Sequence, residues 1–247
     1  MLTSKEQLRY SRQIMLNNIG EQGQLSLSEA KVLIVGVGGL GNTVSMYLAA
    51  AGVGTLYLAD GDSIEITNLQ RQVLFNEKDI DLNKADVAAE KLQQQNPEVT
   101  IEVIDEMLDK ELCDYYVNQV DCVLDCSDNI ATRYLINQSC IEHKVPLVVG
   151  AATGFDGQQL VVDPREPTSA CYQCLFPASE KAPANNCQTI GIIGPVLAIV
   201  AGMQSLQAIK LLTGNKVQLN QLSLFDGLAN QWQQFNLKKQ DNCPVCS

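Results

Sequence analysis

Short apolar runs alternate with longer stretches of helical character through the first half of the chain. The runs cover residues 31–35, 55–59, 99–104, 121–124 and 146–149. The helix-like stretches between them extend to about residue 51 and cover 84–95, 110–119 and 130–143. Strands that alternate with helices form parallel sheets covered by those helices. The pattern therefore predicts a doubly wound, Rossmann-like α/β fold.

The pattern changes after residue 151. Residues 158–162, 219–225 and 233–237 are short strand-like segments that lie on either side of a long apolar segment, and we expect them to be antiparallel additions to the sheet. The first 30 residues predict polar helical turns. We expect one domain over residues 1–247, with a helical segment (1–30), a nucleotide-binding half (31–151) and a C-terminal half (152–247).

Residues 190–212 are apolar for most of their length and must be weighed as a membrane span. Polar residues interrupt the segment, and Gly194-Pro195 suits the start of a buried helix. We interpret it as a helix of the core or of a subunit interface. The preceding residues 163–187 are rich in proline and predict a long crossover loop of the kind that carries function.

Composition restricts the class of partner and the compartment. The net charge of −11 argues against nonspecific binding to nucleic acid or to anionic membranes. The N-terminus has no apolar signal core, and the cysteine count of nine is odd. Both features favour a reducing cytoplasm, where thiols act as ligands or nucleophiles.

A glycine-rich turn follows the first apolar run. Its glycines are Gly36, Gly38, Gly39 and Gly41, and Asp60 ends the next run. Glycines after a strand permit close approach of a phosphate to a helix N-terminus, and a carboxylate at the second strand end suits ribose hydroxyls. No Gly-Lys-Ser/Thr follows, so a P-loop is excluded, while NAD, FAD and ATP all remain open.

Phosphate charge then needs cations from elsewhere in the chain. Arg71 lies in the polar segment 67–72, Lys84 begins a predicted helix, and Arg12 lies in the N-terminal segment. Each also has an ordinary interpretation as a solvated surface cation.

Asp128 and Asn129 lie just beyond the fourth apolar run. Ligands of doubly wound sheets bind outside the carboxyl ends of the strands, and a carboxylate beside phosphates holds Mg²⁺. The alternative is that one of the two residues is only a helix N-cap.

Two Cys-x-x-Cys pairs lie far apart in the chain, Cys171 with Cys174 and Cys243 with Cys246. Two such pairs complete a closed tetrahedral zinc site, which has no open position for substrate and is therefore structural. Unrelated cysteine pairs or a redox dithiol are the alternatives.

In combination these motifs resemble the ubiquitin-activating-enzyme-like adenylyltransferases that serve sulfur-carrier proteins, the ThiF/MoeB/HesA family. The matching segments are residues 9–13, 36–41, 68–72 and 125–129 together with both cysteine pairs, and they occur in the family's order. The details at residues 171–177 and 185–191 are most similar to the ThiF branch.

The resemblance implies a set of site residues and cofactors. ATP would lie over Gly39 with Asp60 on its ribose, Asp128 would hold Mg²⁺ beside Asn129, and zinc would be structural. The phosphates would be bound by Lys84 and by the segment Thr67, Asn68, Leu69, Gln70 and Arg71. It further implies a homodimer in which Arg12 reaches the neighbouring subunit's site.

The implied reaction is adenylation of the C-terminal glycine of a ubiquitin-like carrier ending in Gly-Gly, which enables thiocarboxylate formation for the thiazole of thiamine. Arg71 and Asp128 would serve this chemistry, and residues 152–247 would bind the carrier. Cys187 would act in sulfur transfer, with a separate persulfide protein as donor because no rhodanese-like domain is appended. A surface thiol is the plain alternative for Cys187.

Three other functions remain as alternatives. A molybdopterin-type carrier would be adenylated by the same site. An NAD-dependent oxidoreductase would use the same glycine turn but has no need for the phosphate-facing cations or the zinc site. A noncatalytic nucleotide-binding scaffold would bind ATP without pyrophosphate exchange.

Overall fold

The computed structural model describes residues 1–178 and 191–247. Within these residues, eight strands form one sheet in the order β3-β2-β1-β4-β5-β6-β7-β8. The parallel part contains β1 (Lys31–Val35), β2 (Thr55–Ala59), β3 (Thr100–Ile104), β4 (Cys122–Asp125) and β5 (Leu147–Thr153). The antiparallel part contains β6 (Asp156–Val162), β7 (Gln221–Asp226) and β8 (Gln231–Asn236). The predicted mixed α/β sheet is confirmed.

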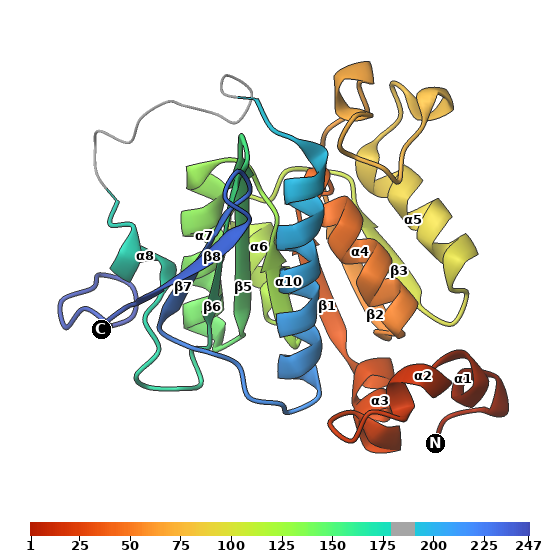
Figure 1. Ribbon diagram of the computed structural model, residues 1–247, viewed down its shortest axis with the longest axis horizontal. Coiled ribbons are helices and arrows are strands. Elements are labelled where there is room, and N and C mark those ends of the chain that lie inside the picture. Colours follow the sequence, from red (N-terminus) through yellow and green to blue (C-terminus); the bar gives the residue numbers. More distant parts are fainter. Residues whose placement is uncertain (179–190) are drawn as a thin grey trace.

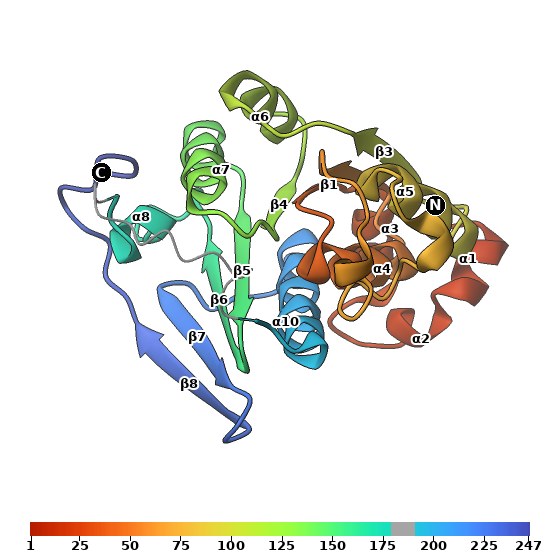
Figure 2. The same cartoon turned by 90° about the horizontal axis from the view of Figure 1, so that it is seen from above.

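Helices cover both faces of the parallel part (Figures 1 and 2). One face carries α4 (Gly39–Ala51), α5 (Lys84–Gln95) and α10 (Gly194–Leu212), and the other carries α6 (Lys110–Val117), α7 (Ile130–His143) and the short α8 (Tyr172–Leu175). Alternate residues of β1 enter the two cores: Ile34 packs with the first group and Leu33 with the second. Because both faces are covered, the strand is a continuous apolar run.

The N-terminal helices α1 (Ser4–Arg9), α2 (Ser11–Ile14) and α3 (Gly20–Glu29) lie at the end of the molecule where the parallel strands begin (Figure 1). The side-chain amides of Gln13 and Gln24 donate to the carbonyl of Ala51, at 2.8 Å and 3.0 Å. Ala51 is the last residue of α4. The polar N-terminal turns are therefore attached to the carboxyl end of that helix.

Helix α10 is the one helix in the described residues that is long and apolar enough to cross a membrane. It packs against α4 and against β4, β5 and β6. Its buried Gln204 donates to the carbonyls of Asp125 at 3.0 Å and Val148 at 3.2 Å. A polar side chain that bonds two strand carbonyls fixes the helix on the sheet, which agrees with the predicted core helix.

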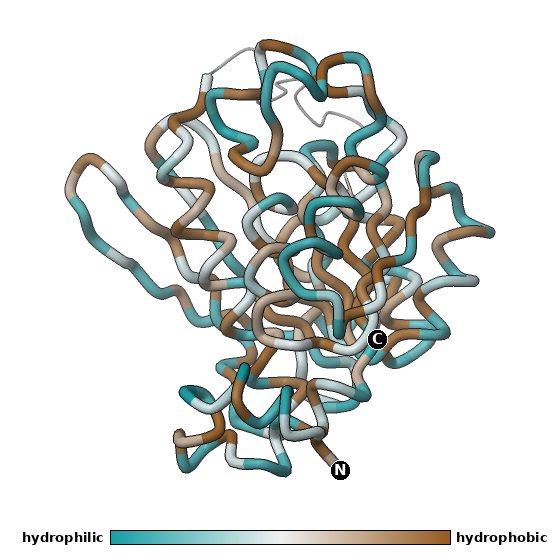
Figure 3. Tube along the Cα trace, turned by 90° about the vertical axis from the view of Figure 1, so that its right-hand side faces the viewer, coloured by the Kyte–Doolittle hydropathy of each residue, from teal (hydrophilic) through white to brown (hydrophobic). Residues whose placement is uncertain are grey.

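Two short 3₁₀ helices, η1 (Ile66–Asn68) and η2 (Glu77–Asp79), occupy the connection from β2 to α5. On the other side of the molecule, the β7–β8 hairpin projects beyond the helical layers (Figure 2). Hydrophobic stretches of the chain run through the middle of the molecule, and hydrophilic stretches predominate in its outer loops (Figure 3). The fold thus leaves the connections at the strand ends to carry the polar chemistry.

Candidate active site and metal centre

The polar clusters predicted at three strand ends lie along one edge of the sheet. In the register, Val35 pairs with Ala59 on one side and with Asp125 on the other. The residues that follow these positions, Gly36, Asp60 and Cys126, are therefore neighbours. Parallel pairing has brought together segments that are up to 90 residues apart in sequence, from Gly36 to Cys126, as expected for the ligand edge of such a sheet.

The turn after β1 requires glycine at two positions. Gly36 has a φ of +89°, and a Cβ there would lie 2.9 Å from the carbonyl oxygen of Cys126. A Cβ on Gly41 would lie 1.9 Å from the carbonyl oxygen of Gly36. Helix α4 begins at Gly39 without a side-chain cap, so its first amides are free to bind an anion.

Asp60 is buried and supports this turn. Its Oδ2 accepts from the backbone N–H of Val37 at 2.7 Å, and its Oδ1 accepts from that of Asp62 at 2.9 Å. Burial raises the pKa of Asp60, and the nearby Lys84 partly offsets this. The carboxylate is thus fixed beside the glycine turn, at the place predicted for a ribose ligand.

The segment 67–71 folds as a compact polar turn. Asn68 is buried, and its Oδ1 accepts from the backbone N–H of Glu65 at 3.1 Å. The Arg71 Nη1 donates to the carbonyl of Thr67 at 2.8 Å, while the Thr67 hydroxyl donates to the Glu65 carboxylate at 3.1 Å. Leu69 is half-buried against the core.

This segment also meets the start of α10. A Cβ on Gly194 would lie 3.1 Å from the carbonyl oxygen of the exposed Gln70 and 3.6 Å from the Cα of Arg71. The predicted phosphate-binding arginine therefore lies beside the first turn of α10.

Lys84 is the first residue of α5, after the N-cap Asn83. Its Nζ lies 2.8 Å from Oδ2 of Asp62, and its side chain is only 8% exposed. Asn83 donates from its side chain to the carbonyl of Asp60 at 3.1 Å, which ties this helix start to the end of β2. The lysine is a buried, positioned cation rather than a solvated one.

Asp128 and Asn129 take different roles. Asn129 caps α7, with its Oδ1 accepting from the backbone N–H of Thr132 at 2.8 Å, so the N-cap alternative applies to Asn129. Asp128 is exposed, and its carboxylate has no hydrogen bond or ion pair with any residue that the structure describes. Its carboxylate is therefore available to a ligand.

The structure does not bring Arg12 to this edge. Arg12 is exposed on α2, near the carboxyl end of α4, whereas Gly39 begins that helix at the opposite end (Figure 1). Within one chain, Arg12 is therefore separated from the other cations. Cys187 lies outside the described residues.

Sequence reasoning missed three residues at this edge. Asp62 pairs with Lys84, and Leu197 packs so closely that a Cβ on Gly39 would meet it at 2.5 Å. Gln72 is buried, and its side-chain nitrogen faces Gly38. Gln72 belongs to the polar segment and could have been found there, whereas no local signal marks Leu197.

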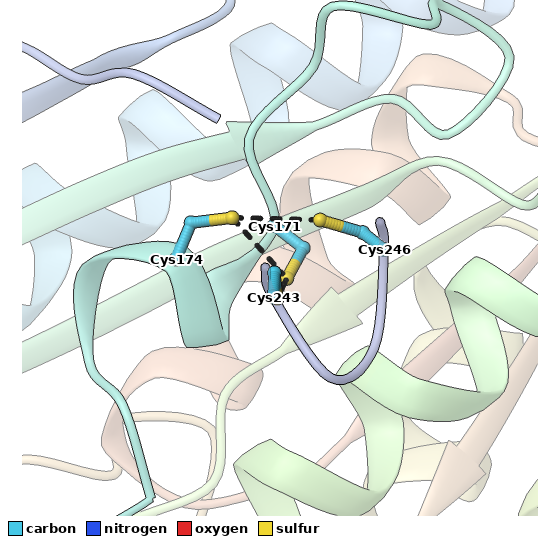
Figure 4. A group of neighbouring side chains, drawn as sticks. All are labelled: Cys171, Cys174, Cys243 and Cys246. Carbon is cyan, nitrogen blue, oxygen red and sulfur yellow. Dashed lines mark hydrogen bonds between the residues drawn. The ribbon is translucent and has the colours of Figure 1, made fainter. Parts of the chain in front are cut away.

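The four predicted zinc ligands converge (Figure 4). Their sulfurs lie within 4.8 Å of one another, with 3.6 Å between Cys171 and Cys243 and 3.4 Å between Cys174 and Cys246. Four thiolates about 2.3 Å from a tetrahedral zinc would be about 3.8 Å apart. These separations are too long for disulfides and suit a metal of that size. The predicted clustering of the four cysteines is confirmed.

Burial and neighbouring groups shift the pKa values of these thiols in different directions. Burial raises the pKa of Cys171 to about 11. Burial also opposes ionisation of Cys243, but backbone N–H groups and neighbouring thiols lower its pKa to about 7. The backbone N–H of Gln240 points to the Cys174 sulfur at 3.4 Å, as in knuckles that hold a thiolate. A divalent cation would stabilise the thiolate forms together.

The fold and the strand-end residues define an α/β protein of the Rossmann-like nucleotide-binding class with a four-cysteine metal centre. The ThiF family model matches residues 10–245, and the chain therefore belongs to the ThiF family. The resemblance seen in the sequence motifs is confirmed.

Curated relatives agree with this assignment. The chain is 43% identical to the Sulfur carrier protein ThiS adenylyltransferase of Escherichia coli, over 99% of this chain and 97% of the relative. It is 40% identical to the Adenylyltransferase and sulfurtransferase MOCS3 of Culex quinquefasciatus, over 100% of this chain and 56% of that relative. The chain is thus an enzyme of the adenylyltransferase class, and it spans about half the length of the MOCS3 relative.

Solved structures support the same fold. E. coli MccB with ATP has a TM-score of 0.82 at 27% identity, covering 97% of this chain and 74% of that one. E. coli MccB with MccA has a TM-score of 0.82 at 26% identity, covering 100% of this chain and 77% of that one.

Proposed function

We propose that the protein transfers the adenylyl group of ATP to the C-terminal glycine carboxylate of a ubiquitin-like sulfur carrier of the ThiS type, ending in Gly-Gly. One observation carries the choice of carrier: the match to the ThiS adenylyltransferase extends over nearly the full length of both chains. The MOCS3 relative is much longer than its matched part. A molybdopterin-type carrier is the second candidate, favoured only by those MOCS3 matches.

The strand-end geometry supports ATP as the nucleotide. The free amides at Gly39 suit phosphate oxygens, Asp60 suits the ribose, and Arg71 and Lys84 supply positive charge. Thr67, Asn68, Leu69 and Gln70 form the wall that positions Arg71, and Asn129 holds the adjoining helix start. A hydride-transfer enzyme would have no need for these cations, so adenylation fits the site better than NAD-dependent oxidation.

Adenylation joins two anions. A carboxylate oxygen of the carrier forms a bond to the α-phosphorus, and the bond from that phosphorus to the oxygen bridging to the β-phosphate breaks, so that pyrophosphate leaves. Arg71 and Lys84 lower the repulsion and stabilise the charge that develops on the phosphoryl oxygens. Asp128, exposed and without a partner in the described residues, would hold Mg²⁺, which neutralises phosphate charge when bound. No covalent protein intermediate is needed at this step.

The adenylate activates the carrier for attack by sulfur. We assign this later step to a persulfide from a separate donor protein: its terminal sulfur would bond to the carrier's carbonyl carbon as AMP leaves, giving an acyl disulfide. The Cys187 thiol would then attack the donor-side sulfur, which breaks the S–S bond, releases the thiocarboxylate and leaves a disulfide between Cys187 and the donor for a cellular thiol to reduce. The product is a carrier thiocarboxylate, which would supply sulfur for the thiamine thiazole. These reactions suit a reducing cytoplasm.

The outer surface of α4 and α10 supports a homodimer. An apolar patch contains the exposed side chains of Tyr47 on α4 and Ile199 and Leu206 on α10. A hollow of about 420 Å³ lies in it and is also lined by Gln13 of α2. A second copy over this patch would cover apolar surface close to Arg12, and would let that cation act on the partner's nucleotide.

The four cysteines would hold a structural zinc ion. Cys171 and Cys174 belong to the start of the crossover, and Cys243 and Cys246 lie near residue 247. The metal would therefore tie the last residues to the start of the crossover that carries Cys187.

The deciding experiment is ATP–pyrophosphate exchange with a panel of purified carriers ending in Gly-Gly. We expect exchange with a ThiS-type carrier and none with the same carrier lacking its terminal glycine. Exchange with a molybdopterin-type carrier alone would assign the second candidate. ATP binding without exchange for any carrier would favour the noncatalytic scaffold and contradict the proposal.

A further inference from the structure

The loop between β4 and α7 is held from two sides by buried groups. On one side, Asp125 Oδ1 accepts from the backbone N–H and the hydroxyl of Ser127, at 3.0 Å and 2.6 Å. On the other, Arg133 Nη2 donates to the carbonyl of Ser127 at 2.5 Å. The residue directly before Asp128 is therefore fixed through its amide, its side chain and its carbonyl.

The Arg133 side chain is buried and held in a fixed position. It lies in α7, and its side chain is only 8% exposed, facing the 1% exposed side chain of Asp125. Arg133 Nη1 and Asp125 Oδ2 are 3.9 Å apart, and neither atom has a hydrogen-bond partner among the residues that the structure describes. The two buried charges therefore compensate each other at ion-pair distance, while the guanidinium also donates to the loop through the Ser127 carbonyl.

Helix α7 is itself held in place by contacts on the turns next to Arg133. One turn further along, Asn137 Oδ1 accepts from the backbone N–H of Tyr172 at 2.8 Å. The ring of Tyr172 also packs edge-on against Tyr134, with 5.9 Å between centroids. The helix that carries Arg133 is thus attached to the cysteine turn 171–174.

Asp128 differs from the residues on either side of it in how its side chain is held. Its neighbours Ser127 and Asn129 are fixed by hydrogen bonds, whereas its own carboxylate is exposed and has no partner among the described residues. A carboxylate of this kind takes its position from the backbone alone. The group that fixes the Ser127 carbonyl then decides where the Asp128 carboxylate points.

We infer that Arg133 is a positioning residue: its guanidinium holds the Ser127 peptide so that Asp128 meets the divalent cation of a bound nucleotide. This inference rests on the proposed role of Asp128. Residues that orient a metal ligand without touching the metal typically contribute 10- to 100-fold to metal affinity. Loss of the fork geometry of arginine should therefore weaken cation binding even when the positive charge is kept.

The test uses Arg133→Lys, which keeps the charge, with Arg165→Lys as the matched control. Arg165 also pairs with a buried aspartate, Asp163, at 2.7 Å, but it follows β6 at the opposite edge of the sheet. Binding of Mn²⁺ in the presence of ATP is measured by electron paramagnetic resonance, without any carrier. We expect about tenfold weaker Mn²⁺ binding for Arg133→Lys and no change for Arg165→Lys.

Two further measurements separate positioning from a general structural role. Thermal melting and zinc content show whether Arg133→Lys is folded, and Arg133→Met serves as a second variant without the charge. In an Asp128→Asn background, Arg133→Lys should weaken Mn²⁺ binding no further, because the group that it positions is gone.

Unchanged Mn²⁺ affinity in folded Arg133→Lys would overturn the inference, as would an equal loss in the Asp128→Asn background. The carrier panel decides the proposed function separately. Failure of exchange with every carrier, combined with tenfold weaker Mn²⁺ binding in Arg133→Lys, would reject the proposed reaction and retain the positioning role.

Discussion

The Asp60 carboxylate accepts a hydrogen bond from the backbone N–H of Val37 at 2.7 Å, inside the glycine turn. The residue proposed to bind ribose therefore also shapes the loop proposed to bind phosphate. Its second oxygen accepts from Asp62, whose own carboxylate holds Lys84. Three parts of the nucleotide site are thus mechanically linked through a single buried side chain.

This relationship predicts a pH dependence. Burial raises the pKa of folded Asp60 above its ordinary value of 3.8. A raised pKa means that the contribution of Asp60 to stability is fully present below the unfolded-state pKa and is lost as pH rises through the folded-state pKa. The free energy of unfolding of the wild type, relative to Asp60→Asn, should therefore fall as pH rises above the ordinary aspartate pKa of 3.8. Urea titrations across that range measure it, and a relative stability that rises with pH would contradict the assignment.

Removal of the Asp128 carboxylate should separate activity from stability. Because the side chain is exposed and has no partner in the described part of the chain, Asp128→Ala should change the free energy of unfolding by less than about 0.5 kcal/mol. ATP–pyrophosphate exchange should fall on the order of 100-fold. The exposed Asp86 in the first turn of α5 provides the control, since Asp86→Ala should leave exchange intact. Wild-type exchange by Asp128→Ala would refute the proposed metal ligand.

The metal centre predicts about one zinc ion per chain. Cys246→Ser should release the metal more readily, whereas Cys113→Ser, which changes a buried thiol outside the cluster, should retain it. Since burial raises the pKa of metal-free Cys171 to about 11, zinc binding must displace protons, and affinity should decrease as pH falls. Elemental analysis and chelator competition at several pH values measure both effects. Freshly purified protein without zinc would rule out the metal centre.

Sulfur transfer should depend on Cys187 more than adenylation does. Adenylation requires no covalent protein intermediate in the proposed mechanism, so Cys187→Ser should keep pyrophosphate exchange close to wild type. Thiocarboxylate formation on the carrier, followed by mass spectrometry, should be impaired. Equal thiocarboxylate yields from the wild type and Cys187→Ser would argue for a mechanism in which the Cys187 thiol is not needed.

Arg12 offers a test of the dimer. Arg12→Ala and Asp128→Ala should each be inactive as pure proteins, because each damages both sites of a homodimer. When the two variants are mixed under conditions that let subunits redistribute, about half of the dimers should contain one subunit of each variant. Each of these hybrid dimers has one intact site, so about a quarter of the wild-type activity should return. Activity that stays at the level of the parent variants would show that Arg12 does not act across subunits.

The sequence by itself determined the features that depend on local pattern and spacing. Apolar runs marked the strands, Gly36 and Gly41 marked the turn that admits no Cβ, and the two cysteine pairs marked a metal centre. Each of these signals lies within a few neighbouring residues or repeats a known ligand spacing. For that reason these features can be recognised without knowledge of the fold.

Only the tertiary structure decided which distant groups meet. Arg133 reaches Ser127, Leu197 packs over Gly39, and the end of β2 meets the start of α5, because sheet register and helix packing set those contacts. It also placed α2, which carries Arg12, away from the strand ends that precede Asp60 and Asp128 (Figure 1). Local sequence encodes the conformation of each segment, whereas the partners of a buried charge are fixed only when the segments pack together.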